Sequence, residues 1–265
     1  MEVKMKKVVV SLFAKTLVAL LAPTICCSNV FAQLTGGTQK AFLQAGIEHS
    51  ERMGPVSKSL KVGTVFDEAK LEKLAPMKIW YRVPPWLAGK WQHEDENQTS
   101  YLDFKTGVTD TQIYHFQNHG IESFGYQRDK LGGIWDYIDL PFITEETSDK
   151  ELDKDRHTDD SIIFDSDARV IVRYVYTRSE LDKHTKVIRG VYQAEEFRTL
   201  FPYGPDMFRS ETSQKKFDDR GNPVYLSKCW RIGKRIAPFK LSSYDSSFGE
   251  YLKANGLDNL VPLQQ

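Results

Sequence analysis

Residues 169–177 have the sequence RVIVRYVYT, and this stretch decides the fold class of the chain. Successive side chains of a β-strand point to opposite faces, so the even-numbered residues from Val170 to Tyr176 form an apolar face. The odd-numbered face carries the polar residues Arg173 and Thr177 beside Ile171 and Val175. This pattern is typical of an antiparallel sheet with one face on a core and the other partly wet.

Similar short strands are predicted on both sides of this stretch. Turn residues separate the β-branched and aromatic runs, and DDRGN at residues 218–222 is a strong hairpin signal. The expected strands cover residues 90–94, 100–104, 111–116, 121–128, 134–140, 161–164, 169–178, 186–195, 208–217 and 223–232. Short connections predict antiparallel pairing. We therefore expect a mainly β fold, an antiparallel up-and-down barrel of about 8–10 strands, with an antiparallel β-sandwich as the alternative.

Short helices are expected at both ends of the β domain. Apolar spacing and capping residues predict one helix over residues 38–53, a second over 66–74, and a third over Ser246–Ala254, where Asn255 and Gly256 end it. The predicted division is a leader over residues 1–32, a helical lead-in over 33–79, an antiparallel β domain over 80–240 and a tail over 241–265.

The first 32 residues predict an export signal. Three lysines at positions 4, 6 and 7 precede an apolar run, and Ala32 supplies a small residue for signal peptidase. We expect cleavage near Ala32-Gln33, hence a periplasmic or secreted protein with a bacterial-type leader. Lys15 keeps the apolar run below the roughly 20 residues of a spanning helix. We expect no transmembrane span after cleavage.

Charge and cysteine content narrow the function classes. Without the leader the chain loses four lysines and one glutamate, which leaves 32 basic and 35 acidic residues. Nucleic acid binding requires a clustered excess of Lys and Arg, so we expect no nucleic acid partner. Cys229 is the only cysteine after the leader, so the exported chain has no internal disulfide. No phosphate-binding loop is present, and we expect no cofactor.

Residues 144–160 interrupt the strand pattern. Eight Asp and Glu residues there outnumber three Lys and Arg residues, which predicts a solvated, mobile loop. A second hypothesis for function follows from this loop: a periplasmic or secreted structural module that contacts an envelope protein through the loop and the lead-in helices.

Gly89-Lys90-Trp91 follows a tight turn at residues 84–88. This segment resembles the opening of lipocalins and related ligand-binding barrels, and the similarity extends from about Trp86 to Ile236. The resemblance implies that the turn closes the barrel floor beneath the tryptophan. It also implies that an arginine of the last strand stacks on the indole and donates to carbonyls of the turn. Arg231 lies on the last predicted strand.

A barrel of about eight strands can hold one small ligand. Our leading hypothesis is therefore an exported, non-enzymatic protein that binds a small apolar or amphipathic molecule. The candidate lining residues are aromatic residues of the predicted strands: Tyr114, Trp135, Tyr174, Tyr176 and Tyr192.

Metal binding and hydrolysis are weaker hypotheses. His115 and His119 share a strand face, and with His93 they are candidate zinc ligands. Gly120, however, indicates that the strand ends near His119, which favours surface positions for the two histidines. No Gly-x-Ser-x-Gly elbow is present. A hydrolase would therefore need residues that converge only in three dimensions, with Glu195 and His115 as the residues to test.

Overall fold

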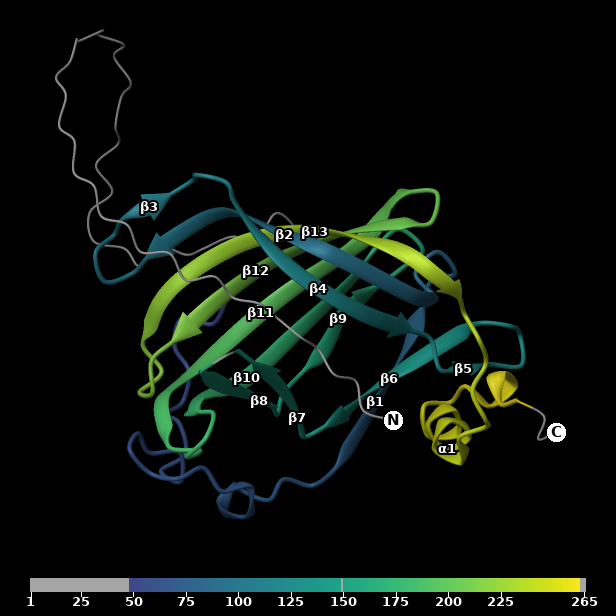
Figure 1. The fold of residues 1–265 in the computed structure, drawn as a ribbon. Coiled ribbons are helices and arrows are strands. Elements are labelled where there is room, and N and C mark those ends of the chain that lie inside the picture. Colours follow the sequence, from purple (N-terminus) through teal and green to yellow (C-terminus); the bar gives the residue numbers. More distant parts are fainter. Residues whose placement is uncertain (1–47, 149, 263–265) are drawn as a thin grey trace, which may run out of the picture.

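The computed structural model of the chain describes residues 48–148 and 150–262. It is mainly β, with antiparallel sheets and one short α-helix (Figure 1), which confirms the predicted class. The elements in chain order are a 3₁₀ turn (Glu68–Lys70), β1 (Met77–Val83), β2 (Gly89–Asp103), β3 (Thr109–Asp110), β4 (Tyr114–Phe124), β5 (Gln127–Arg128), β6 (Ile134–Leu140), β7 (Phe142–Thr147), β8 (Glu151–His157), β9 (Ser161–Asp165), β10 (Val170–Asp182), β11 (Ile188–Gly204), β12 (Met207–Phe217), β13 (Pro223–Pro238), α1 (Ser246–Ala254) and a second 3₁₀ turn (Asp258–Leu260).

The main sheet has ten strands and is strongly curved (Figure 1). Its order is β3-β2-β13-β12-β11-β10-β8-β7, with β4 also paired to β2 and β9 also paired to β10. Within the described residues no ladder joins β4 to β7. A second sheet has the order β1-β6-β5. The chain connects it to the main sheet at two places, since β5 follows β4 closely and β7 follows β6.

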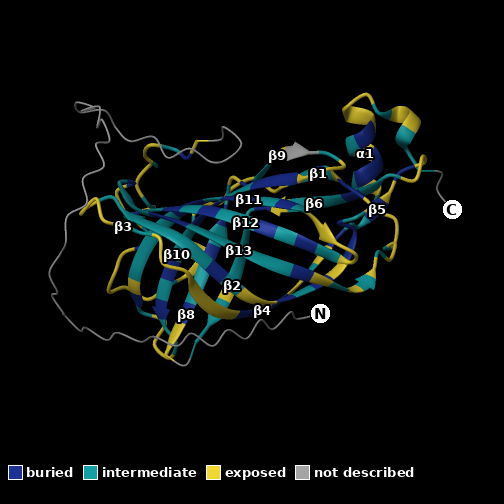
Figure 2. Ribbon diagram, turned by 90° about the horizontal axis from the view of Figure 1, so that it is seen from above, coloured by how far each residue is buried: buried dark blue, intermediate teal, exposed yellow. Residues whose placement is uncertain are grey.

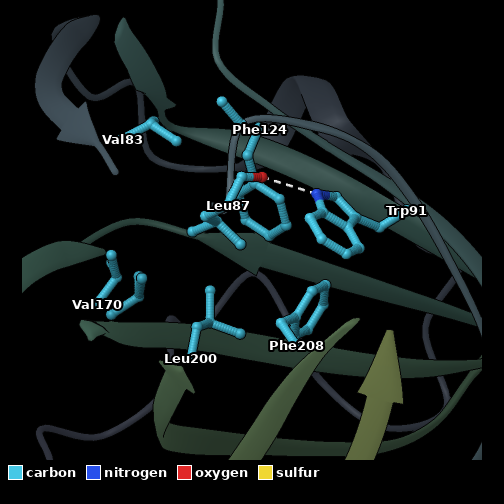
Figure 3. Close-up of a cluster of buried hydrophobic side chains, with 9 residues drawn as sticks. Val83, Leu87, Trp91, Phe124, Val170, Leu200 and Phe208 are labelled. Carbon is cyan, nitrogen blue, oxygen red and sulfur yellow. Dashed lines mark hydrogen bonds between the residues drawn. The ribbon is translucent and has the colours of Figure 1, made fainter. Parts of the chain in front are cut away.

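Burial alternates along much of β12, whereas β10 and β11 carry buried residues on both faces (Figure 2). On β11 the even-numbered residues from Ala194 to Leu200 point to the concave face, and the odd-numbered ones point to the outside. At one end of the concave face a plug of apolar side chains is buried (Figure 3). It includes Leu87 of the turn, Trp91 of β2, Phe124 of β4 and Phe208 of β12.

The C-terminal helix covers the small sheet. Asp245 accepts a hydrogen bond from the Ser247 amide, as helix N-caps do. Phe248 and Leu252 of α1 then pack against Trp80 and Trp135 of β1 and β6. The predicted helix over Ser246–Ala254 is confirmed with the same bounds.

The lead-in differs from the prediction. Residues 1–47, which include the leader and most of the first predicted helix, lie outside the described residues. Residues 48–53 contain no helix, and the second predicted helix shrinks to a 3₁₀ turn at Glu68–Lys70. The reason is that the segment lies as a strap against the main sheet, where Leu60 packs on Leu152 and Leu181. Some of its amides bond to hairpin turns of the sheet, and others form only isolated turns within the strap.

The acidic segment is a hairpin, so the expected mobile loop at residues 144–160 is wrong. Strands β7 and β8 pair antiparallel from Phe142↔His157 to Thr147↔Leu152, and β8 pairs with β10. Arg178 of β10 offsets the charge, because its Nε donates to Asp155 at 2.6 Å and its Nη1 to Asp153 at 3.4 Å. In the described part of the chain, no helix combines the length and apolar character needed to cross a membrane.

Candidate functional site

A cavity of about 1350 Å³ lies on the concave face of the main sheet. Its lining comes from β1, β2, β4, β6–β8 and β10–β13, and combines tyrosine rings with charged side chains. The plug closes one end of it. The cavity exists because the sheet curves while its concave face carries polar residues that do not pack together as a core does.

The turn at residues 84–88 supports the plug. The Leu87 and Ala88 amides donate to the Pro84 carbonyl at 2.9 and 3.2 Å, and the Trp91 indole donates to the Leu87 carbonyl at 2.7 Å (Figure 3). Gly89 follows with φ +139°, and a Cβ there would lie 2.7 Å from the Ala237 carbonyl oxygen. Only glycine fits this close approach without strain.

The arginine over the tryptophan is Arg235, not Arg231. Its guanidinium lies 4.2 Å from the centroid of the Trp91 ring. It donates to the Ala88 carbonyl and, at 2.6 Å, to the Trp86 carbonyl. Strand β13 extends to Pro238, beyond its predicted end at residue 232, and this places Arg235 level with the turn. Arg231 instead faces the cavity.

Two arginines share one carboxylate inside the cavity. Arg198 Nη2 donates to Glu122 Oε2 at 2.6 Å, and Arg231 Nη2 donates to Glu122 Oε1. Burial alone raises the pKa of Glu122, but the two guanidiniums outweigh it and lower this pKa to about 2. Glu96 lies 3.9 Å from Arg231 and accepts from Asn118 at 2.8 Å.

The three candidate metal ligands do not converge. His93 is buried against Gly120, with its Nε2 3.4 Å from Arg231 Nη1, and burial with this neighbouring charge lowers its pKa to about 4. His115 is exposed and its Nδ1 contacts Asn97 Oδ1, and His119 is exposed. No cluster of three His, Cys, Asp or Glu residues within 48–148 and 150–262 is placed to hold a metal ion.

The cavity continues from these arginines towards β8 and β10. Gln214 Nε2 donates to the Tyr176 hydroxyl at 2.7 Å and to Glu196 Oε2 at 3.2 Å. Burial raises the pKa of Glu196. At the far side the Arg178–Asp155 pair and Tyr225 belong to the lining. The cavity therefore has ion pairs at two places, with tyrosine rings and an amide between them.

Two of the five candidate aromatic residues line the cavity, namely Tyr174 and Tyr176. Tyr192 lies outside the lining, beside Arg178 and Lys216. Trp135 is buried against α1, where its indole donates to Asp129 at 2.8 Å. Tyr114 is exposed on β4 and donates to Asp110 at 2.8 Å. The prediction that Trp135 and Tyr114 line the cavity fails because strand propensity does not indicate in which sheet, or on which face of it, an aromatic side chain lies.

Sequence reasoning missed Glu122, Arg198 and Gln214 as lining residues. The usable signal was alternation on β11. Glu195 and Glu196 point to opposite faces, as a continuing strand requires, so Arg198 shares the face of Glu196. Glu195 faces away from the cavity and contacts His49 at 3.1 Å, while Ser213 lies 2.9 Å from the other ring nitrogen of His49. All three are buried where the strap meets the main sheet, away from the cavity.

Cys229 lines the cavity but is not activated. Burial raises the pKa of its thiol, and the Glu96 carboxylate adds to this effect. Since the thiolate is the nucleophile, this environment does not suit nucleophilic catalysis.

Comparisons with protein-family models, curated proteins and solved structures give no match to this chain.

Proposed function

We propose that this protein is an exported, non-enzymatic carrier that holds one small amphipathic molecule inside a barrel-like sheet. The supporting observation is the cavity, whose volume of about 1350 Å³ exceeds the roughly 300–1,000 Å³ of most small-molecule sites. Its walls come from strands and its closed end from the plug, and sites on such elements hold their shape.

The lining favours an amphipathic ligand over a purely apolar one. Arg198, Arg231 and Glu122 face the same space as Tyr174 and Tyr176. An apolar molecule would cover the charged groups without offering hydrogen bonds, and burial of unpaired polar groups costs free energy. Tyrosine accepts a ligand body on its ring and a polar group at its hydroxyl.

Export belongs to the proposal and rests on the leader sequence. The partner-module hypothesis loses its support, because the acidic segment is a paired hairpin whose carboxylates contact Arg178.

The test is a variant that fills the cavity. Thr212 of β12 is in the lining, so Thr212→Trp projects a large ring into it. Thr199→Trp is the matched control, because alternation places Thr199 on the outer face of the neighbouring strand, β11. We expect native mass spectrometry of protein purified from its source, without denaturation, to show a bound small molecule in the wild type and the control, and not in Thr212→Trp.

A bound mass retained by a folded Thr212→Trp variant would contradict the proposal. So would an empty wild-type protein that also fails to bind amphipathic molecules added in solution.

A further inference from the structure

We infer that the ligand is uncharged and rich in hydroxyl groups, with an apolar face or tail. This inference rests on the proposed carrier function and names the chemistry of the same cavity. It follows from three properties of the lining: its arginines are paired with carboxylates, it offers both donors and acceptors, and tyrosine rings lie among these polar groups.

The three arginines of the cavity are paired with carboxylates. The guanidiniums of Arg198 and Arg231 stand against the carboxylates of Glu122 and Glu96. At the far side Arg178 is paired with Asp155. A ligand with a net charge would add an unmatched charge to a partly desolvated site, which is costly. The arginine charges are therefore already matched and do not favour an anionic ligand. A cationic ligand at Glu196 would lie near Arg198 and Arg231, whose charges act on that carboxyl group.

Among the described residues Glu196 forms no ion pair, although the charges of Arg198 and Arg231 act on it. Its described hydrogen bond comes from the uncharged Gln214, and burial raises its pKa. A ligand hydroxyl can donate a hydrogen bond to a carboxyl group or accept one from it, so it fits Glu196 without bringing a charge.

Arg231 has a hydrogen-bond donor that is not used within the described part of the protein. Its Nη2 bonds to Glu122, its Nη1 is 3.4 Å from His93, and among the described residues its buried Nε has no partner. Buried polar groups of this kind normally find acceptors. The oxygen of a ligand hydroxyl can accept from this guanidinium while its hydrogen is donated to a carboxylate such as Glu96 or Glu196.

Tyrosine rings supply the apolar contacts. Tyr174, Tyr176 and Tyr225 line the space around these polar groups. A ring face packs against C–H groups and its hydroxyl reaches a polar atom. A saccharide, a polyol or the head of a glycosylated lipid combines C–H faces with hydroxyls in this way, and an aliphatic acid does not.

The experiment compares three amphiphiles that share an eight-carbon tail: octyl β-glucoside, octanoate and octylammonium. Each is titrated into the purified wild-type protein by isothermal calorimetry, below the concentration at which it forms micelles. We expect the glucoside to bind at least about tenfold more tightly than either charged molecule, since each buried hydrogen bond to a charged group is worth about that factor. Methyl β-glucoside, which lacks the tail, shows whether the head alone is held.

A pair of variants tests the site. Arg231→Lys keeps the charge but loses donors, and we expect it to weaken glucoside binding about tenfold. Arg189→Lys is the matched control on the exposed end of β11, beside Asp182, and should leave the affinity within about twofold. Circular dichroism checks that both variants fold.

The outcomes separate the two proposals. Equal affinities for the three amphiphiles, or tighter binding of octanoate or octylammonium, would overturn this inference and leave the carrier function standing, provided Thr212→Trp abolishes that binding. Absence of binding by all of them would overturn this inference, and it would overturn the carrier function as well if native mass spectrometry also shows the wild-type protein to be empty.

Discussion

One guanidinium decides how the closed end of the cavity is built. Arg235 stacks on Trp91 and donates to two carbonyls of the turn at residues 84–88. The sequence predicted this arrangement but assigned it to Arg231, because the last strand was expected to end at residue 232. Arg231 and Arg235 are close on one strand, and only the pairing of β13 with β2 distinguishes their surroundings.

Replacement of Arg235 should destabilise the fold. We expect Arg235→Ala to lower the free energy of unfolding by about 2–4 kcal/mol, because it removes two charge-assisted hydrogen bonds and a cation–π contact. Lys234→Ala, on the exposed neighbouring position, should cost less than about 0.5 kcal/mol. Urea denaturation of both variants provides the comparison, and equal losses would show that neither the hydrogen bonds nor the stacking of Arg235 stabilises the fold.

At the scale of elements, the acidic hairpin shows why composition wrongly predicted a mobile loop at residues 144–160. Its carboxylates outnumber its cations, which is the usual mark of a solvated loop, yet Asp153 and Asp155 of β8 point to Arg178 of the adjacent β10. The compensating charge lies on another strand, more than twenty residues away in the chain. No local pattern within residues 144–160 contains it.

Removal of that charge should loosen the hairpin. Arg178→Met leaves several neighbouring carboxylates without compensation, a change that costs about 3–5 kcal/mol for buried pairs. We expect amide hydrogen exchange to become faster across residues 142–157. The exposed Arg189→Met substitution should leave this region unchanged. Exchange that stays slow in Arg178→Met would mean that backbone pairing alone holds the hairpin.

At the scale of the whole molecule, the strap from residue 48 to 76 joins distant parts of the main sheet. Met53 donates to Gly221 in the turn between β12 and β13 at 3.0 Å, and Gly63 and Thr64 bond to Ile188 after the turn between β10 and β11 at 2.8 Å. Near its described start, Ser50 and His49 contact Glu195. The strap thus couples the outer face to the ends of two hairpins.

This coupling predicts a pH dependence of stability. Burial alone raises the pKa of Glu195, but hydrogen bonds from His49, Ser50 and Arg173 lower it to about 2, from an ordinary value of 4.5. The stabilising contribution is therefore complete above pH 4.5 and is lost as the pH falls towards 2. Its size is roughly 3 kcal/mol. Urea midpoints of the wild type should fall over this range more than those of Glu195→Gln, and parallel curves would contradict the coupling.

The strands could be predicted because their signals are local. The alternation at residues 169–177 and the turn at 218–222 each depend on a few neighbouring residues. The candidate site depends on the curvature of the sheet and on the order of its strands. These bring together side chains such as Glu122 and Arg198, which lie 76 positions apart in the sequence. A strand pattern shows that the side chains of Glu195 and Glu196 point to opposite faces of the sheet. It does not show which of them contacts the strap and which lines the cavity.

Two unpaired strand edges border the cavity, since β4 bonds only to β2 and β7 only to β8 in the described ladders, and both strands contribute to the lining. The distance between these edges is set by the bending of strands rather than by hydrogen bonds that must break. Under the proposed carrier function, this bending would adjust the width of the cavity to ligands of different size, while the strands keep the lining residues in place. Recognition would then depend on the chemistry of the lining more than on a fixed width.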